Sequence, residues 1–308
     1  MTNPGWGPAA EGGGPQPQPR CVHHPDRPTL LACSRCGRPA CPECLRPASV
    51  GQHCVDCVVA AQRSAPQART IAGAPVRTNR PTPIVTYALI ALNVLIFGIT
   101  AAQSGSVLNN ERGSSLFIDW ALWPPIIAAN GDWFRLLGSG FLHFGPIHLA
   151  VNMFALWVIG RDTELILGRA RYLSVYLLSI LGGSAAVMLL QTGAVTAGAS
   201  GAVFGLMGAQ AIILLRLRRS PTPVLTVVGL NVLISVTIPG ISLWGHLGGL
   251  VAGAATTAAL LYAPQYLGAG TDRDRIVRTG WFALGAVAVV ILVVIALAVL
   301  RLRSQLGV

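Results

Sequence analysis

Long apolar runs separated by short polar or Gly- and Pro-containing segments dominate this chain from about residue 84 onward. A helix needs about 20 predominantly apolar residues to cross the roughly 30 Å hydrocarbon core of a bilayer. Runs of this length predict seven transmembrane helices, over about residues 84–103, 145–160, 172–190, 198–215, 222–238, 241–262 and 281–300. The pattern therefore predicts an all-α polytopic membrane protein.

The composition supports this fold class. Hydrophobic residues make up 53% of the chain and charged residues only 11%, whereas about 25% charged residues are typical of soluble domains. This excludes a soluble enzyme. The formal net charge is +11, but the arginines bracket the apolar runs and do not gather into one patch, so we expect no nucleic-acid partner.

The arginines also predict the orientation of the chain in the membrane. They lie before the first predicted helix, between the second and third, after the fourth and after the sixth: Arg77, Arg80, Arg161, Arg169, Arg171, Arg216, Arg218, Arg219, Arg273, Arg275 and Arg278. If the helices alternate in direction, all these loops face the cytoplasm, as the positive-inside rule requires. We therefore expect a plasma (inner) membrane protein with a cytoplasmic amino terminus and an external carboxyl terminus, although Arg301 and Arg303 run against the pattern.

The amino-terminal part contains four ligand pairs of metal-site spacing. They are Cys21-x2-His24, Cys33-x2-Cys36, Cys41-x2-Cys44 and Cys54-x2-Cys57. Zinc prefers four tetrahedral sulfur and nitrogen ligands, often from such short spacings, and a cytoplasmic segment is kept reduced, which argues against disulfides. We expect a module over residues 21–58 that folds around two structural zinc ions.

The pairing of these ligands is open from the sequence. The spacing resembles cross-braced fingers of the B-box kind, in which Cys21, His24, Cys41 and Cys44 would hold one ion and Cys33, Cys36, Cys54 and Cys57 the other. Sequential pairing is the alternative, and His23 or His53 could replace His24 or Cys54. Closed four-ligand sites leave no position for a substrate, so the module would be structural or would bind a cytoplasmic protein partner.

The remaining segments complete the expected domain organisation. Residues 1–20 are rich in Gly, Pro and Gln and have no apolar core, so we expect a disordered segment and no signal peptide. Residues 59–82 are typical of a flexible linker. Residues 83–265 would form a six-helix catalytic core, and residues 266–308 a loop and the seventh helix. Tryptophans in the first external loop, about 104–142, predict that it lies partly in the outer leaflet.

Ser200 and His246 are the polar residues that point most directly to function. Ser200 lies in Gly198-Ala199-Ser200-Gly201 and His246 in Gly245-His246-Leu247-Gly248-Gly249, each near the start of an apolar run. Polar side chains inside a membrane are costly and are read by default as functional. In the predicted topology Ser200, His246, His148 and Asn152 all lie near the outer side, where they can face one cavity.

Glycines supply a reason for close approach of these helices. Gly201 and Gly205 form a small face on the fourth predicted helix, and Gly245, Gly249 and Gly253 form a longer one on the sixth. Such faces let helix backbones approach closely in lipid. The polar Asn93 and Asn231, by contrast, suit a role in joining helices.

The residue types at these positions predict a serine hydrolase. A hydroxyl at a helix start lies among free N–H groups that can stabilise an oxyanion, and His148 and Asn152 can add side-chain donors. No Asp or Glu is available at this depth to orient His246, so the arrangement is a dyad, with Phe204 able to stack on the imidazole. His143 fits a loop-fixing, hydrogen-bonding residue better than a catalytic one.

These residues resemble the rhomboid family of intramembrane serine proteases over about residues 84–262. The shared motifs are Trp133-Phe134-Arg135, His143-x4-His148-x3-Asn152, Gly198-Ala199-Ser200-Gly201 and His246-x2-Gly249. Phe134 departs from the pattern, since many members carry a second Trp there. The resemblance implies a six-helix core, Ser200 as nucleophile, His246 as general base, and His148 with Asn152 in the oxyanion site.

The expected function is therefore an endopeptidase that needs no catalytic cofactor. By resemblance, single-span membrane protein substrates would pass beside the fifth helix and be cleaved near the outer membrane boundary. The alternative is a catalytically inactive relative that binds membrane clients, against which the intact Ser200 and His246 pair argues. A small-solute transporter would predict internal repeats with broken helices, and the chain has no convincing repeat.

Overall fold

The structure, a computed structural model, describes residues 18–64, 69–74 and 82–307. It divides into two compact units, Met1–Gln67 and Ala68–Val308. Most of the segment expected to be disordered, residues 1–17, lies outside the described residues, as do Arg77 and Arg80.

The amino-terminal unit has little regular structure. A 3₁₀ turn, η1 (Pro42–Cys44), leads into a two-stranded antiparallel sheet of β1 (Leu45–Pro47) and β2 (Gln52–Cys54), with Leu45 opposite Cys54. Helix α1 (Val55–Ser64) follows. The predicted module boundary at residue 58 thus falls inside a helix, because the helix that begins at Val55 continues through the apolar and long-chain residues after Cys57.

Cysteines form most of the core of this unit. The buried cluster consists of Cys21, Cys33, Ala40, Cys41, Cys44, Leu45 and Cys54. Among the described residues of this cluster, Leu45 is the only large aliphatic side chain. Units this small bury too little apolar surface to be stable without cross-links or metals, so an additional link between the cysteines is expected on energetic grounds.

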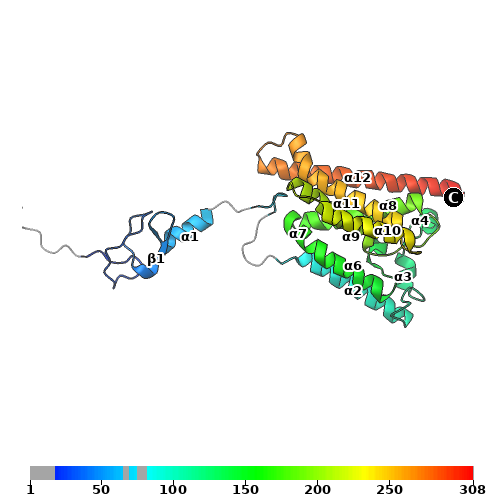
Figure 1. Ribbon diagram of the computed structural model, residues 1–308, viewed down its shortest axis with the longest axis horizontal. Helices are drawn as coiled ribbons and strands as arrows, with labels where there is room; N and C mark the ends of the chain where they lie inside the picture. Colours follow the sequence, from blue (N-terminus) through cyan, green and yellow to red (C-terminus); the bar gives the residue numbers. More distant parts are fainter. Residues whose placement is uncertain (1–17, 65–68, 75–81, 308) are drawn as a thin grey trace, which may run out of the picture. The chain divides into compact units, whose positions relative to one another are not determined.

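All regular secondary-structure elements in the described part of the second unit are helices, which confirms the predicted fold class. Its helices lie lengthwise beside one another in Figure 1. They are α2 (Ile84–Ser104), α3 (Ser115–Trp120), α4 (Pro124–Asn130), α5 (Arg135–Gly138), η2 (Ser139–Phe141), α6 (Gly145–Ala155), the π-helical turn η3 (Leu156–Gly160), α7 (Arg161–Leu167), α8 (Arg169–Leu190), α9 (Ser200–Arg216), α10 (Thr222–Thr237), α11 (Leu243–Tyr266) and α12 (Arg273–Leu306).

Helices occupy all seven predicted membrane positions, but they differ in length. In the described part of the chain, α2, α8, α11 and α12 are long and apolar enough to cross a membrane, and residues 145–167 form a further apolar helix bent by 92° from residues 135–141. Helices α9 and α10 are shorter than the predicted spans, with 17 and 16 residues. At 1.5 Å per residue α9 covers only about 25 Å.

Helix α9 begins at Ser200, and an irregular segment leads into it. Backbone polar groups that are buried away from water need hydrogen-bond partners. The segment before α9 meets this condition, because Thr196 exchanges backbone hydrogen bonds with Leu122 and the N–H of Gly198 donates to the carbonyl of Ser139 at 2.9 Å.

Glycines bring α9 and α11 into backbone contact. An ideal Cβ built on Gly249 would lie 2.0 Å from the carbonyl oxygen of Gly201, and one on Gly253 would lie 2.1 Å from that of Gly205. The two predicted glycine faces therefore meet. Helix α8 joins them through Gly182 and Gly183, which lie against the backbone of Gly248 and Gly245.

Part of the predicted linker belongs to the helical unit. In residues 69–74 the hydroxyl of Thr70 donates to the carbonyl of Ile166 at 2.6 Å, and Arg171 donates to the carbonyl of Ala72. Ala74 is buried. This turn closes over the junction of α7 and α8 because its backbone finds partners there that the linear sequence does not reveal.

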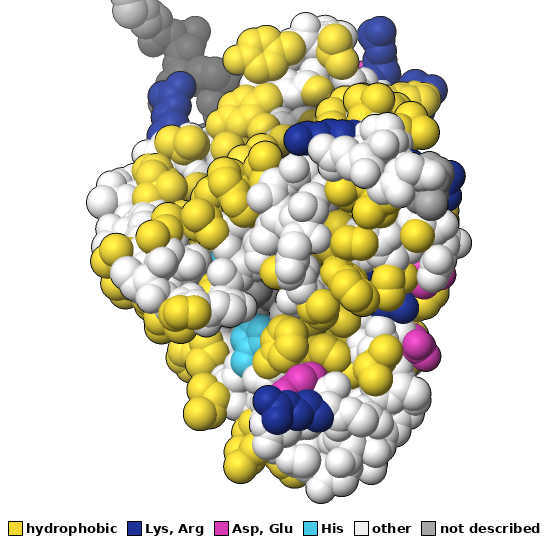
Figure 2. Space-filling view, turned by 90° about the vertical axis from the view of Figure 1, so that its right-hand side faces the viewer, with side chains coloured by type: hydrophobic (Ala, Val, Ile, Leu, Met, Phe, Trp, Pro, Cys, Tyr) yellow, Lys and Arg dark blue, Asp and Glu magenta, His cyan; other side chains and the backbone are white. Residues whose placement is uncertain are grey.

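The loop between α2 and α6 is a folded layer. Arg135 is buried and donates to the carbonyls of Ile118 and Ala121, and its Nε lies 3.2 Å from Asp132. Figure 2 views the end of the unit that carries this loop, where hydrophobic side chains gather and charged ones are scattered. Arg303 near the end of α12 donates to the carbonyl of Ala128 at 2.7 Å, so the loop binds this arginine.

Candidate active site and metal centres

Ser200 and His246 are in direct contact. The Oγ of Ser200 lies 2.8 Å from the Nε2 of His246, the distance of a good hydrogen bond. Ser200 is the first residue of α9, and His246 lies in the first turn of α11. The pair thus depends on the glycine contacts that hold these two helix ends together.

Two further side chains hold the imidazole of His246. The ring of Phe204 stacks on it with centroids 4.2 Å apart and planes at 10°. The Oγ of Ser235 lies 2.8 Å from Nδ1. Among the described residues no carboxylate is hydrogen-bonded to this ring, so the base is oriented by an aromatic face and a hydroxyl.

A small cavity of about 50 Å³ adjoins the pair. Its wall includes Ser200, His246 and the polar or small residues Ser139, Gly183, Ser184, Gly198, Gly201 and Ser242. The cavity is open on one side and places the hydroxyl of Ser200 and the imidazole of His246 in the same wall.

The start of α9 offers hydrogen-bond donors to this cavity. The first N–H groups of a helix have no partner within it, and they carry the positive end of the helix dipole. Gly201 and Ala202, in the first turn of α9, line the cavity. A negative oxygen next to Ser200 would meet these donors.

His148 and Asn152 lie beside this site but do not line the cavity. His148 packs against Gly198, where an added Cβ would come within 3.0 Å of Nε2. Its Nδ1 accepts the N–H of Phe144 at 3.3 Å, which leaves the proton on Nε2, the nitrogen nearer Gly198. The side-chain amide of Asn152 donates one N–H to the carbonyl of His148 at 2.9 Å. The second N–H of this amide is not used in that bond.

Gly198 is required by its conformation as well as by its neighbours. Its φ of +142° lies in a region that side chains rarely adopt, and His148 occupies the space that a Cβ would take. This glycine lets the chain turn into α9 next to the imidazole of His148.

His143 differs in part from its expected role. It is fully buried, and its carbonyl accepts the side-chain amide of Asn110 at 2.9 Å. Its ring nitrogens have no hydrogen-bond partner among the described residues. The ring packs edge-on against His148 at 5.2 Å, so the loop is fixed by the backbone and by ring packing.

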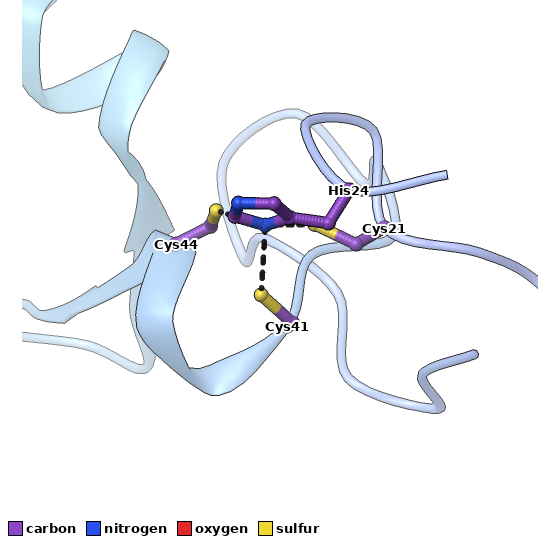
Figure 3. A group of neighbouring side chains, drawn as sticks. All are labelled: Cys21, His24, Cys41 and Cys44. Atoms are coloured by element: carbon purple, nitrogen blue, oxygen red, sulfur yellow. Dashed lines mark hydrogen bonds between the residues drawn. The ribbon is translucent and has the colours of Figure 1, made fainter. Parts of the chain in front are cut away.

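The amino-terminal unit groups its ligand-type side chains into two clusters. Figure 3 shows the first, in which the Nδ1 of His24 lies 3.4 Å from the Sγ atoms of Cys41 and Cys44 and 3.8 Å from that of Cys21. Tetrahedral zinc with usual bond lengths separates nitrogen and sulfur ligands by about 3.6 Å. The donor set and spacing of this cluster therefore fit one zinc ion.

Cys33, Cys36, Cys54 and Cys57 form the second cluster. In each cluster the ligand atoms lie within 4.8 Å of one another, and the Sγ atoms of Cys36 and Cys54 are 3.7 Å apart. This is the cross-braced grouping, in which the first pair joins the third and the second joins the fourth. His23 and His53 belong to neither cluster, and His23 contacts Asp56 at 3.1 Å.

The thiols within a cluster differ in acidity. Burial raises the pKa of Cys21, but the backbone N–H groups of Cys41 and His23 outweigh it and bring the pKa to about 6. Burial and the neighbouring thiols raise the pKa of Cys44 to about 11. Sulfurs this close repel one another once ionised, and a bound cation would remove that repulsion.

Ser235 is the site residue that the sequence pattern did not indicate. A serine in an apolar helix commonly bonds to the carbonyl four residues earlier, as Ser235 does to Asn231 at 2.7 Å. It belongs to no motif. The only signal in the sequence was a polar residue within a predicted membrane helix.

Comparisons with known proteins agree on one family. The Rhomboid domain family matches residues 130–263. The chain is 34% identical over 183 residues to Rhomboid protease GluP of Bacillus subtilis. The aligned residues make up 58% of this chain and 35% of GluP. It is 31% identical over 172 residues to Rhomboid-type serine protease 2 of Emericella nidulans, covering 52% of this chain and 33% of that protein.

The coverage differs among the relatives. The match spans about a third of GluP and 37% of RHOMBOID-like protein 4 of Arabidopsis thaliana. The rhomboid-family protein YdcA of Bacillus subtilis is 30% identical over 177 residues, and these cover 85% of YdcA and 56% of this chain. The alignment covers most of YdcA at 30% identity, so the chain belongs to the rhomboid family. Together with its long apolar helices, this makes the chain a multi-pass membrane protein.

Proposed function

We propose that this chain is an intramembrane serine endopeptidase in which Ser200 is the nucleophile and His246 the general base. The observation that carries the proposal is the 2.8 Å hydrogen bond between the Ser200 hydroxyl and Nε2 of His246. A serine hydroxyl is a weak nucleophile unless a neighbouring base removes its proton during attack. The names of GluP and of the Emericella nidulans relative, both called proteases, support the same activity.

The first step is acyl transfer to Ser200. Nε2 of His246 takes the hydroxyl proton as Oγ attacks the peptide carbonyl carbon, which gives a tetrahedral intermediate and an imidazolium. The intermediate collapses when Nε2 returns the proton to the departing amine nitrogen. The carbon–nitrogen bond breaks and an ester on Ser200 remains. Water activated by the same imidazole then hydrolyses this ester and regenerates Ser200.

Donors beside Ser200 stabilise the intermediate. Gly201 and Ala202 line the cavity, and the N–H groups of the first turn of α9 have no partner within the helix. Electrostatic stabilisation by such donors is usually the largest contribution to catalysis. His148 would donate from Nε2, since its Nδ1 is occupied by Phe144. Asn152 would donate the side-chain N–H that does not bond the carbonyl of His148.

Single-span membrane proteins are the proposed substrates, cleaved near the outer boundary of the plasma (inner) membrane. Support comes from the depth of the site. Ser200 begins α9, whereas Arg216, Arg218 and Arg219 mark the cytoplasmic end of that helix under the positive-inside rule. The same rule gives a cytoplasmic amino terminus and an external carboxyl terminus.

Two zinc ions are proposed for the amino-terminal unit, one in each cluster of four ligands. They would hold the unit together and take no part in peptide cleavage, since all four positions of each ion are filled by side chains. The unit would then serve to bind a cytoplasmic protein. The alternative for the whole chain, a client-binding protein without activity, is disfavoured by the aligned Ser200 and His246.

A fluorophosphonate probe tests the proposed activity. The probe reacts with a serine only when a base activates it, so we expect labelling of the wild-type chain in detergent or lipid. Ser200→Ala should show none, and His246→Ala should react far more slowly. Labelling that is equal in wild type and Ser200→Ala would contradict the role of Ser200. A wild-type chain that neither reacts nor cleaves a single-span membrane substrate would favour the client-binding alternative.

The oxyanion site can be tested with His148. Loss of one oxyanion donor typically costs about 3 kcal/mol, or roughly a hundredfold in rate, so His148→Ala should lower kcat by about that factor with folding retained. Ser304 on α12 is exposed, and its hydroxyl donates to the carbonyl of Arg301 in the same helix. Ser304→Ala is therefore a suitable control and should keep the wild-type kcat. An unchanged kcat in His148→Ala would exclude His148 from the oxyanion site.

A further inference from the structure

Ser235 on α10 is the side chain that meets the proposed base on the nitrogen opposite Ser200. Its Oγ lies 2.8 Å from Nδ1 of His246, and both residues are buried. Because a buried polar contact of this length strongly constrains the ring, it bears on how His246 is oriented and where its proton lies.

The hydrogen bonds around Ser235 determine the direction of proton donation. Ser235 has one hydroxyl proton and two oxygen or nitrogen neighbours, the carbonyl of Asn231 at 2.7 Å and Nδ1 of His246 at 2.8 Å. The carbonyl can only accept. If the hydroxyl donated to Nδ1, two oxygens 2.7 Å apart would face each other without a proton between them, so the hydroxyl donates to Asn231.

This assignment has a direct consequence for the imidazole. Nδ1 must carry the proton and donate it to Ser235, which leaves the lone pair on Nε2. Nε2 can then accept the hydroxyl proton of Ser200, as the base role requires. The chain of donors runs from Ser200 to His246 and from His246 through Ser235 to the backbone of α10.

We propose that Ser235 is a positioning residue that holds His246 in the tautomer and orientation needed to activate Ser200. This inference rests on the proposed function. Ser235 occupies the position at Nδ1 that a carboxylate takes in a catalytic triad. Its side-chain oxygen can also stabilise the imidazolium formed during attack. It comes from α10, whose buried side chains are Val228 and Ser235, so the position of α10 sets whether this oxygen reaches the ring.

Three single variants of the full chain separate this role from a structural one. Ser235→Ala removes only the oxygen. Ser235→Thr keeps a hydroxyl able to make both bonds. Thr237→Val is the matched control, because Thr237 is exposed on the same helix and its hydroxyl bonds only the backbone of Leu233 and Ile234. Thermal unfolding of each purified variant reports whether the fold is retained.

The rate of fluorophosphonate labelling is the main measurement, because a small probe does not require a substrate helix to enter. A net hydrogen bond of ordinary strength corresponds to about a tenfold change in rate. We therefore expect Ser235→Ala to label about tenfold more slowly than wild type, with Ser235→Thr and Thr237→Val close to wild type. For cleavage of a membrane substrate, Ser235→Ala should lower kcat and leave KM unchanged.

The outcomes distinguish this inference from the proposed function. If wild type labels at Ser200 and Ser235→Ala labels equally fast, Ser235 does not position the base although the protease assignment stands. The same conclusion follows if Ser235→Thr is as slow as Ser235→Ala while its thermal unfolding is unchanged. If wild type itself does not label, the proposed function fails first. A shift of the ¹⁵N resonances of His246 from the Nδ1-protonated tautomer in Ser235→Ala would support the inference directly.

Discussion

The cysteines of the amino-terminal unit serve both as its core and as its candidate zinc ligands. A core with a single large aliphatic side chain, Leu45, cannot offset the conformational entropy lost on folding. Metal coordination supplies the missing free energy in such units. Arg38 adds further contacts around the second cluster, because it donates to the Sγ atoms of Cys36 and Cys54 and to Asp56.

Two double variants test the pairing of these ligands. In the cross-braced grouping Cys33 and Cys57 bind the same ion, so Cys33→Ser/Cys57→Ser should retain about one of two zinc ions. Cys21→Ser/Cys33→Ser damages both sites and should retain none. Sequential pairing gives the reverse, since Cys21 and Cys33 would then share an ion. Metal analysis of the purified full chain, with the wild type at about two ions, measures the difference.

Glycine contacts between α9 and α11 determine how closely the two site helices approach. Gly249 and Gly253 lie against the carbonyls of Gly201 and Gly205, and neither backbone can move away as a flexible side chain could. The same contacts hold the Ser200 end of α9 next to the His246 turn of α11. Stability and the geometry of the proposed dyad therefore depend on one packing surface.

A methyl group at Gly249 should separate these helices. Its Cβ would lie 2.0 Å from the carbonyl oxygen of Gly201. Overpacking typically costs roughly 1–3 kcal/mol, and Gly249→Ala should lower the free energy of unfolding by at least about 1 kcal/mol. Labelling of Ser200 should fall with it, because the distance to His246 increases. Thermal unfolding and probe labelling measure the two effects.

Gly285 provides the matched control for this substitution. It lies within α12, and an added Cβ there meets nothing within 4 Å. Gly285→Ala should leave unfolding and labelling as in wild type. Equal effects of the two substitutions would mean that the α9–α11 contact does not limit stability.

The distribution of charge over the whole chain determines its expected orientation. Arginines follow α9 and α11 and precede α8 and α12, and such an asymmetry directs these ends to the cytoplasm. Arg303 lies near the carboxyl-terminal end of α12, which this pattern places outside. Its guanidinium donates to the carbonyl of Ala128 in the loop between α2 and α6, so a contact within the fold accounts for this arginine.

Reporter fusions test this orientation. Fusions after about residue 60 and after about residue 270 should be cytoplasmic, and one near Asn109 should be external. Alkaline phosphatase and green fluorescent protein, which are active on opposite sides of a bacterial inner membrane, give complementary readings at each position. An Asn109 fusion on the cytoplasmic side would reverse the topology and would place Ser200 at the wrong face for the proposed cleavage.

Some features of this protein follow from the linear chain because they depend on local chemistry. Apolar length predicts the positions of the seven helices, since each must satisfy its own backbone hydrogen bonds in lipid. Spacing of Cys and His identifies eight ligand-type residues, because a metal site needs donors a turn apart. The motifs around Ser200 and His246 indicate the rhomboid family, which the comparisons confirm. Their catalytic roles and the domain boundaries stay predictions.

Other features depend on contacts between residues distant in the chain. The grouping of the eight ligands and the turn at residues 69–74 on α7 and α8 arise from packing that no local pattern encodes. Ser235 is the clearest case. A hydroxyl in an apolar helix has the same local signature whether it bonds only its own backbone or also a neighbouring imidazole. The packing of α10 against α9 and α11 brings it within 2.8 Å of His246.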